Sequence, residues 1–513
     1  MVQQKLDGAT IDRLLQEGLQ EGHITEMIAA VTELHNGRLT PLPDMKQINM
    51  QLDPNTHDVM DHALRKDKRV VVDPQSEDYG RVMDVNPNSE RDGAGENTRI
   101  EKVTRIALAL QKLIRDRAVS WTFGIPVQYN CKPDNDTQKQ VFDALKRIYY
   151  DVKINTINRK VARHLYGHTE VAEYWYPVST EKHTLYGFET PVKFKVAIFS
   201  PAYGDTLYPY FDANRDLIAF SREFTRKDND LQTRSYFETW TAEWHYLWSS
   251  DATQAGAKTN NWQIVDGYPV QNAIGKIPVI YGSQPEPEWQ CVQGLIDRLE
   301  KLLSNFGDTN DYHASPKIFV KGHIVGFARK GDAGGIIEGD DGAEAQYLSW
   351  ANAPESVKLE IETLLRMIYT LTRTPDISWE GVKSLGNISG VALKLLFMDA
   401  DLKVQDKCEI WDDYLPRRNN VVKAYLKIAN LKQQGWQDAA DQLMIEPIVT
   451  PYTIEDEDGK VSRLTAANGG KAIASRRTTI AKLGWVDDAD QELSDIETEE
   501  AAERSATQGE FTI

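Results

Sequence analysis

The sequence TRTPDISWEGVKSLGNISGVALKL, residues 372–395, separates two segments with helical periodicity. Apolar residues mark one helical face from Val357 to Leu371, and a much longer helical pattern opens at Ser389. The connection carries Gly381 and Gly386, which we expect to act as pivots because glycine adopts backbone conformations closed to other residues. A loop held by helices on both sides can be positioned against a moving object, so this stretch indicates a mechanical part.

A second helix of the same kind precedes this region. Its apolar residues recur every three or four positions from Trp289 to Phe306, as expected for one face of an α-helix. Between the two helices, residues 317–321 and 346–350 have the pattern of short strands. The sequence therefore predicts a helical hairpin with a small β insert at its tip. The long helix from Ser389 should kink or restart at Pro416, because proline lacks the amide hydrogen that a helix needs.

The first half of the chain mixes helical and strand-like patterns. Helices are expected over residues 11–32, 100–114 and 138–166. Strands are expected over residues 69–72, 167–177, 194–199, 217–220, 236–240, 243–248 and 262–265. The fold class is therefore α+β, and the chain from residue 439 onward is expected to be partly helical and increasingly acidic.

Composition places the chain among ordinary soluble folded proteins. It has 513 residues, 41% of them hydrophobic and 27% charged, which predicts about two to four domains. No apolar run is long enough to span a membrane, and the N-terminus lacks the layout of a signal peptide. Cys131, Cys291 and Cys408 lie far apart, so we expect neither disulfides nor a thiolate metal cluster, and synthesis in a reducing cytoplasm.

The chain is acidic, with 59 Lys and Arg residues against 77 Asp and Glu residues and a net charge of −18. A protein that holds nucleic acid statically neutralises phosphates with a basic face, so this excess argues against tight DNA binding. It does not argue against DNA that slides past the protein, because a negatively charged surface offers the phosphates no binding sites. Solubility alone is the simpler explanation of the acidity.

His164, His168, Glu170 and Glu173 form the best enzyme-like constellation. Histidines four residues apart on a helix can present two nitrogens to one metal ion. However, the pattern is not His-Glu-x-x-His, and Gly167 is expected to break the helix between them, so a structural role is favoured. The sequence also lacks a phosphate loop and a nucleophile elbow, so no catalytic, cofactor or metal site is predicted. A cytoplasmic metal-dependent hydrolase that uses His164 and His168 is the alternative.

Two other groups of polar residues are candidates for partner contacts. In the loop, Trp379 and Lys383 could contact a partner, with Glu380 and Ser384 beside them. In the β insert, charges of both signs suit a partner surface: Lys317, Lys321, Arg329, Lys330 and Asp332. The simpler alternatives are an ordinary surface loop with a buried tryptophan and a solvated hairpin.

Five segments carry a resemblance through their shared order. They are WTFGIPV at 121–127 after a helix, ARHLYGHTE at 162–170, IPVI at 277–280 before a helix, SGVALK at 389–394, and SRRTTI at 475–480. Over residues of about 97 to 500, this order resembles the portal proteins of tailed bacteriophages, in particular those of long-tailed phages. Residues 58–95 and 240–262 match no part of the family pattern.

The resemblance implies a ring, dodecameric in that family, at one capsid vertex of a virion assembled in the host cytoplasm. Double-stranded DNA would pass along its axis during terminase-driven packaging and leave by the same route at ejection. The implied partners are further copies of the chain, the DNA, the terminase large subunit, the major capsid and scaffolding proteins, and a head-tail adaptor, with no cofactor and no membrane. A general capsid or adaptor protein, a third possibility, should lack this order of segments.

The resemblance also implies a portal layout along the chain. Its parts are an α/β wing at 1–284, a stem helix at 285–315, a β-containing clip at 316–352, a second stem helix at 353–373, a tunnel loop at 374–388, a long kinked wing helix at 389–432, and a helical crown with an acidic tail at 433–513. In this layout Trp379, Glu380, Lys383 and Ser384 line the DNA channel. The clip charges would face the motor and later the adaptor.

Overall fold

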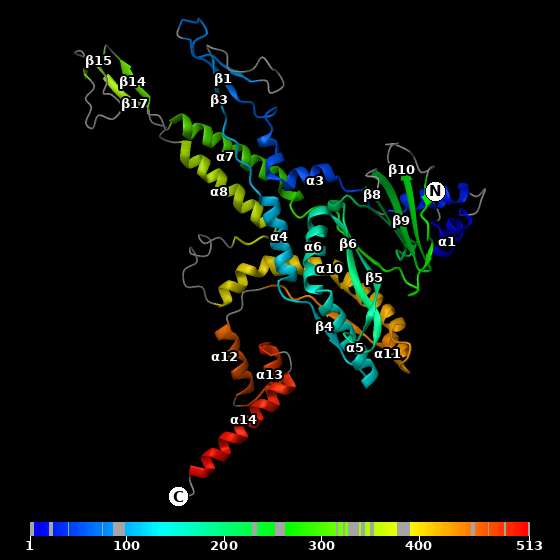
Figure 1. The fold of residues 1–513 in the computed structure, drawn as a ribbon. Coiled ribbons are helices and arrows are strands. Elements are labelled where there is room, and N and C mark those ends of the chain that lie inside the picture. The colour runs from blue at the N-terminus through cyan, green and yellow to red at the C-terminus, as the bar shows by residue number, and fades with distance from the viewer. Residues whose placement is uncertain are drawn as a thin grey trace. The chain divides into compact units, whose positions relative to one another are not determined.

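The computed structural model describes residues 5–510, except 20–23, 39, 74, 86–97, 228–232, 252–261, 314–316, 322–323, 327–337, 340–343, 349–352, 377–389, 453–456, 470 and 487–488. Helices and strands both contribute to the fold, which confirms the α+β class (Figure 1). The chain forms two compact units. The first comprises Met1–Thr374 and Leu402–Pro451, and the second comprises Pro375–Asp401 and Tyr452–Ile513.

The helices of the first unit share a common design, in which one face is buried and the other is polar. They are α1 (Gly8–Glu17), α2 (Ile24–Asn36), α3 (Met45–Leu52), α4 (Leu110–Phe123), α5 (Asp136–Asp151), α6 (Ile154–His168), α7 (Gln293–His313), α8 (Ala353–Leu371) and α11 (Trp436–Gln442), with the single turns η1 (Pro54–Thr56), η2 (Asp58–Met60), η4 (Pro201–Tyr203) and η5 (Gln290–Val292). Helix α10 (Gly390–Ala429) is the longest, at 40 residues, and belongs to both units.

The strands form antiparallel sheets. The largest has the order β11-β10-β9-β8-β7, with β12 beside β10. Smaller sheets have the orders β13-β5-β6, β2-β1-β3, β18-β4, β14-β17 and β15-β16. The strands are β1 (Lys68–Val71), β2 (Val82–Asp84), β3 (Thr98–Glu101), β4 (Gln128–Cys131), β5 (Glu170–His183), β6 (Thr190–Phe199), β7 (Thr206–Phe211), β8 (Leu217–Lys227), β9 (Thr233–Thr241), β10 (Trp244–Asp251), β11 (Gln263–Ile264), β12 (Val270–Gln271), β13 (Val279–Ser283), β14 (Lys317–Lys321), β15 (Ile324–Gly326), β16 (Glu338–Gly339), β17 (Glu344–Leu348) and β18 (Ile445–Ile448).

The six-stranded sheet is covered on both faces. Side chains of a strand alternate between faces, so neighbouring residues of β8 serve different cores. Ala219 packs with residues of α1 and α2, whereas Phe220 packs with residues of β5, β6 and β13. The two helices therefore lie on one face of the sheet, as Figure 1 shows for α1, and the β13-β5-β6 sheet lies against the other.

Helix α10 is fastened to the centre of the first unit by a buried ion pair. The Arg418 guanidinium donates to both Glu173 oxygens on β5, at 2.7 and 2.6 Å, and to Asn158 on α6 at 2.6 Å. Arg418 and Glu173 are both 0% exposed, and Tyr414 donates to the same carboxylate. Because unpaired buried charges cost several kcal/mol, this arrangement fixes α10 against β5 and α6.

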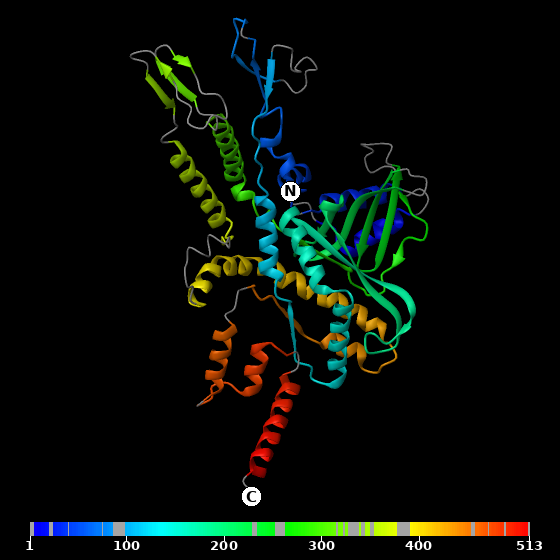
Figure 2. The same cartoon turned by 60° about the vertical axis from the view of Figure 1, so that its left-hand side comes forward.

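Helices α7 and α8 lie side by side and carry the β14-β17 sheet at their far end (Figure 2). Leu299, Leu302, Leu364 and Ile368 lie in one buried cluster that includes both helices. This confirms the expected helical hairpin with a β insert, although α8 begins at Ala353 and β17 ends at Leu348.

The expected helix over residues 100–114 is wrong for its first ten residues. Residues 98–101 form β3, residues 102–109 have no regular structure, and α4 begins only at Leu110. The amides of Thr104, Ile106 and Leu108 donate to side chains of α7, namely Asp308 at 2.6 Å, Ser304 at 2.9 Å and Glu300 at 2.7 Å. Tertiary hydrogen bonds thus replace those of a local helix.

Other helix boundaries also differ from expectation. The helix expected over 11–32 is two helices, α1 and α2, and that over 138–166 is α5 and α6, which are separated at Lys153 by a left-handed backbone (φ 56°). Gly167 was expected to end the helix, but α6 continues through it to His168. Helix α10 continues through Pro416 without a restart.

The second unit contains the first part of α10 and three further helices, α12 (Glu457–Asn468), α13 (Arg476–Leu483) and α14 (Ala489–Glu510). Arg476 pairs with Glu500, and Arg477 pairs with Asp490, so α13 and α14 are joined by exposed ion pairs. The helical character expected after residue 439 is confirmed.

The Arg418–Glu173 pair should contribute far more to stability than its exposed neighbour. We expect Arg418→Met to lower the free energy of unfolding by about 3–5 kcal/mol, because Glu173 would remain as an unpaired buried charge. Arg417→Met is the matched control, since Arg417 pairs with Asp413 at side-chain exposures of 41% and 62% and should lose about 0–1 kcal/mol. Urea unfolding measures both. Equal losses of unfolding free energy in the two variants would contradict a dominant buried pair. Adding Glu173→Leu to R418M should recover part of the lost stability, because no buried charge is then left unpaired.

Candidate functional site at the base of the 377–389 segment

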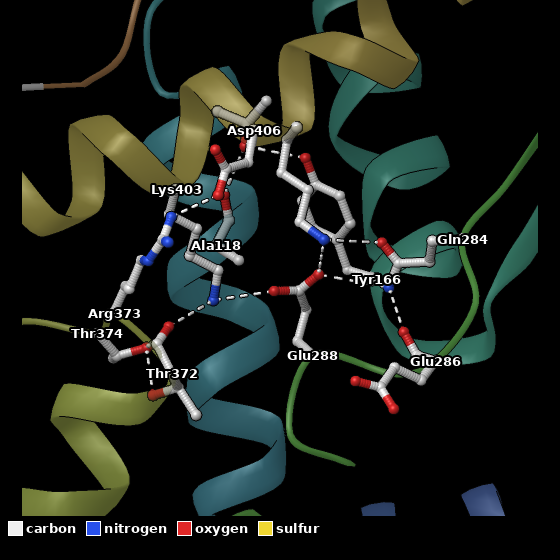
Figure 3. Close-up of polar contacts among 12 residues, drawn as sticks. Ala118, Tyr166, Gln284, Glu286, Glu288, Thr372, Arg373, Thr374, Lys403 and Asp406 are labelled. Atoms are coloured by element: carbon white, nitrogen blue, oxygen red, sulfur yellow. Dashed lines mark hydrogen bonds and ion pairs between the residues drawn. The ribbon is translucent and has the colours of Figure 1, made fainter. Parts of the chain in front are cut away.

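The four loop residues predicted to meet DNA, Trp379, Glu380, Lys383 and Ser384, lie outside the described residues. The structure does describe the polar residues around Thr374, where the chain leaves the first unit for that segment. These residues come from the chain before η5, from the end of α8 and from α10 (Figure 3). We call Glu288, Lys403 and Lys407 the lysine clasp.

In the lysine clasp, the Glu288 carboxylate forms ion pairs with two lysines of α10. The Lys403 ammonium lies 2.9 Å from one carboxylate oxygen and the Lys407 ammonium lies 2.5 Å from the other. Lys407 also donates to the Gln284 side chain at 3.0 Å and lies over the Tyr166 ring, 5.2 Å from its centroid. Since Lys403 and Lys407 lie one helical turn apart, one carboxylate can pair with both.

The clasp also holds the end of α8. The Lys403 ammonium donates to the carbonyl of Thr372 at 3.0 Å, and the Thr374 amide donates to the carbonyl of Tyr369 at 2.8 Å. Arg373 has a positive φ of 49° and pairs with Asp406 on α10. The residues just before the 377–389 segment are therefore tied to α10 by one buried and one exposed contact.

Burial and charge shift the pKa values of Lys403 and Glu288 in opposite directions. Burial lowers the pKa of Lys403, and the Glu288 carboxylate opposes that shift. Burial alone would raise the pKa of Glu288, but the two ammonium groups lower it. Glu288 is therefore ionised at neutral pH, and the cluster is an ion pair rather than a neutral hydrogen bond.

Sequence reasoning missed the clasp. Lys403 is the signal that could have found it, because it falls among the apolar positions of α10 that include Val404, Trp411 and Leu415. A lysine or arginine on a buried helical face is almost always paired. The identity of the partner, however, depends on tertiary contacts across more than a hundred residues.

The predicted partner surface of the β insert is described only in part. Arg329, Lys330 and Asp332 lie outside the described residues. Lys317 and Lys321 begin and end β14, opposite Leu348 and Glu344 of β17. The Lys321 side chain is 73% exposed and its ammonium lies 3.9 Å from Glu344, so it forms only a loose surface pair.

Three of the four residues of the alternative metal site, namely His164, Glu170 and Glu173, have other partners. The two ring nitrogens of His164 lie 3.1 Å from the Ser200 hydroxyl and 3.0 Å from the Tyr203 hydroxyl. Glu170 binds Arg38 and Tyr281, and Glu173 binds Arg418. Within the part of the chain that the structure describes, no group of three His, Cys, Asp or Glu residues could hold a metal ion. The arrangement is that of a packed polar core.

Comparison with known proteins identifies the family. The family model described as phage portal protein, SPP1 Gp6-like, matches residues 53–506. Because this match covers most of the chain, the chain belongs to that family of portal proteins. It therefore serves as a DNA conduit at a capsid vertex of a phage-like particle.

Solved structures give a distant likeness, and no curated protein sequence matches the chain. A chain in the neck of an empty GTA particle computed with C6 symmetry is 10% identical, with 73% of this chain and 88% of that chain covered and a TM-score of 0.38. A chain from the virion of the native gene transfer agent (GTA) particle is 10% identical over the same shares, with a TM-score of 0.34. A chain in the neck of the native GTA particle computed with C12 symmetry is 11% identical, with 73% of this chain and 88% of that chain covered and a TM-score of 0.36.

Among the described residues, none of the helices has the length and apolar character needed to cross a lipid bilayer.

Breaking the clasp should loosen the end of α8. We expect Lys403→Met to speed hydrogen exchange at the Thr372 and Thr374 amides at least about tenfold, because Glu288 loses a partner and the Thr372 carbonyl loses its donor. Arg373→Met, which removes only the exposed pair with Asp406, is the control and should change exchange less. Mass spectrometry of peptides that cover the end of α8 measures both; equal protection in the two variants would contradict the clasp.

The half-buried His164 and the buried His168 should make the fold sensitive to acid. Burial lowers the pKa of both His164 and His168 to about 4, helped by Arg115 at His164 and by His164 and Arg115 at His168, whereas the unfolded rings titrate at about 6.5. The stability that each neutral ring contributes is therefore complete above pH of about 6.5 and is lost as pH falls toward about 4, at about 1.4 kcal/mol per pH unit. Melting temperatures should fall less steeply over this window in His168→Gln than in the wild type.

His62→Gln is the control for this pH dependence, because the His62 side chain is 61% exposed. It should keep the wild-type slope. If the His168→Gln slope also equals that of the wild type, the buried imidazole does not cause the acid sensitivity.

Proposed function

We propose that this portal protein works as a ring of identical subunits, twelve as in its family, around an axial channel for double-stranded DNA. The match to the portal family over residues 53–506 carries this proposal. Portal proteins themselves do no bond chemistry, so the working energy would come from the terminase ATPase and the chain would not be an enzyme. The metal-dependent hydrolase is disfavoured because His164 and the two acids it needs, Glu170 and Glu173, are engaged with other protein groups.

The portal layout is the finer part of the proposal. We assign 1–284 to the wing, 285–315 and 353–373 to the stem, 316–352 to the clip, 374–388 to the tunnel loop, 389–432 to the long wing helix and 433–513 to the crown. The antiparallel α7 and α8 with β14-β17 at their tip support the stem and clip, and the 40-residue α10 supports the long wing helix.

The tunnel loop would act as a part positioned against DNA that moves. The lysine clasp supports this role, because it fixes the chain just before the loop to α10 through buried groups. Because the base of the loop is held in place, the position of the flanking helices determines the position of the loop tip. Within the loop, Lys383 would make brief phosphate contacts and Trp379 would pack against the neighbouring copy or meet DNA, with Glu380 and Ser384 beside them, and one cation per subunit would not hold the DNA in place.

The partners follow from this role. At the clip, the charged residues Lys317, Lys321, Arg329, Lys330 and Asp332 would meet the terminase large subunit during packaging and the head-tail adaptor afterwards. The wing would meet the major capsid and scaffolding proteins while the particle assembles in the host cytoplasm. The exposed Lys321 side chain supports a partner-facing clip.

The proposal predicts separable effects on assembly and on DNA. Negative-stain images of the purified chain should show annular particles, and deletion of Ser378 to Gly386 should leave those rings intact because the deletion removes no residue of the lysine clasp. The same deletion should reduce the amount of DNA packaged or retained in assembled particles by about tenfold or more. Absence of annular particles under all conditions would refute the ring, and normal packaging by the deletion variant would refute the axial placement of the loop.

A further inference from the structure

Helix α6 carries an exposed basic face in an otherwise acidic protein. Its sequence, INTINRKVARHLYGH, contains no carboxylate, whereas the whole chain has a net charge of −18. Arg159, Lys160 and Arg163 are exposed, and Lys153 extends the same face at the N-terminal end of the helix. Arg159 and Lys160 lie four and three residues before Arg163, and Lys153 lies seven residues before Lys160, which places all four on one side of the helix. Arg163 also lies 3.4 Å from Asp116 of α4, whereas no ion pair among the described residues involves Arg159 or Lys160. We call these four residues the basic stripe.

Helix α10 carries an exposed face of opposite charge. Asp406, Glu409, Asp412 and Asp413 are all exposed and lie within two turns of the helix. The only cation in this span is Lys407, which is half-buried and bound to Glu288. Asp406 and Asp413 already pair with Arg373 and Arg417 of the same subunit, whereas no ion pair among the described residues involves Glu409 or Asp412. These two carboxylates repel their neighbours and are stabilised when a cationic surface covers them. We call these four residues the acidic stripe.

The two stripes belong to one rigid part of a subunit but do not neutralise each other. Helices α6 and α10 contact each other through their buried faces, where Trp411 donates to Tyr166 at 2.8 Å and Arg418 donates to Asn158 at 2.6 Å. Both stripes lie on the solvent-exposed sides of these helices, and no ion pair joins them among the described residues. Arg159 and Lys160 of the basic stripe and Glu409 and Asp412 of the acidic stripe are therefore available to a neighbouring subunit.

A closed ring requires such a pair of unlike surfaces. In a head-to-tail interface, one patch of each copy meets a different patch of the next copy, and the two patches must be complementary. We infer that the basic stripe of one subunit docks on the acidic stripe of the next, so that charge sets the order and orientation of neighbouring copies. This inference rests on the proposed ring and adds the residues that close it.

The strength of this contact should depend on repetition. A single exposed ion pair is weak and is screened by salt, with a Debye length of about 10 Å at about 0.1 M. The same contact recurs at every interface of a ring. A small change in the free energy of each contact therefore has a large effect on the fraction of protein that forms rings. Charge also rejects wrong neighbours, because like stripes that face each other repel.

Charge reversal tests the inference on the full-length protein. One variant combines Arg159→Glu and Lys160→Glu, and the other combines Glu409→Lys and Asp412→Lys. Each alone should lower the ratio of rings to monomers by about tenfold or more at low salt, as measured by size-exclusion chromatography with light scattering. An equimolar mixture should restore rings, because each variant then finds complementary stripes on both neighbours. All four substitutions in one chain should also restore rings.

The matched control combines Lys139→Glu and Arg147→Glu, which change the same charge on the exposed face of α5 and should leave rings unaffected. Circular dichroism melting confirms that each variant is folded.

Rings that persist in both reversed variants would overturn the inference while leaving the ring itself intact, whereas wild-type protein without rings would instead refute the proposed function. Failure of the mixture to restore rings would also overturn it. If the α6 variant keeps its rings but binds less duplex DNA in a filter assay, the basic stripe serves DNA and the inference is wrong.

Discussion

Buried carboxylates determine where the longest helix can lie. Glu288 and Glu173 are each enclosed, and each accepts cations from α10: Lys403 and Lys407 in the first case, Arg418 in the second. A displaced α10 would leave both carboxylates unpaired, at a cost of several kcal/mol for each. The helix therefore has one position relative to β5, α6 and the end of α8. Apolar contacts alone would tolerate small sliding movements, whereas paired charges do not.

This constraint links parts of the chain that are remote in sequence. Glu288 precedes the α7–α8 hairpin, Thr372 follows it, and Lys403 bonds to both. The hairpin thus begins and ends at the same buried cluster, which makes its two helices a single mechanical element anchored on α10. Under the proposed function, a motor and moving DNA would act on the same molecule, and such an anchor would keep load from separating the helices.

Sequence patterns predicted the helices and strands whose own residues determine them. The apolar face of α7 and α8, the β insert between them and the strands β5, β6, β8, β9 and β10 follow from period and residue type, whereas β7 was missed. The order of the segments was enough to recognise the portal family. The errors arose where distant groups override local preference. Residues 102–109 have a helical pattern but are extended, because α7 supplies acceptors for their amides, and the break at Lys153 has no strong local signal. The lysine clasp could be suspected from Lys403 but its partner could not.

The extended segment beside α7 has a consequence for how that helix can move. Alternate residues of the segment, Thr104, Ile106 and Leu108, meet every fourth residue of the helix, Asp308, Ser304 and Glu300. Two extended residues span about 6.6 Å and four helical residues span about 6 Å, so the two repeats match. Helix α7 can therefore neither rotate about its axis nor shift along it by a fraction of a turn without breaking all three hydrogen bonds at once.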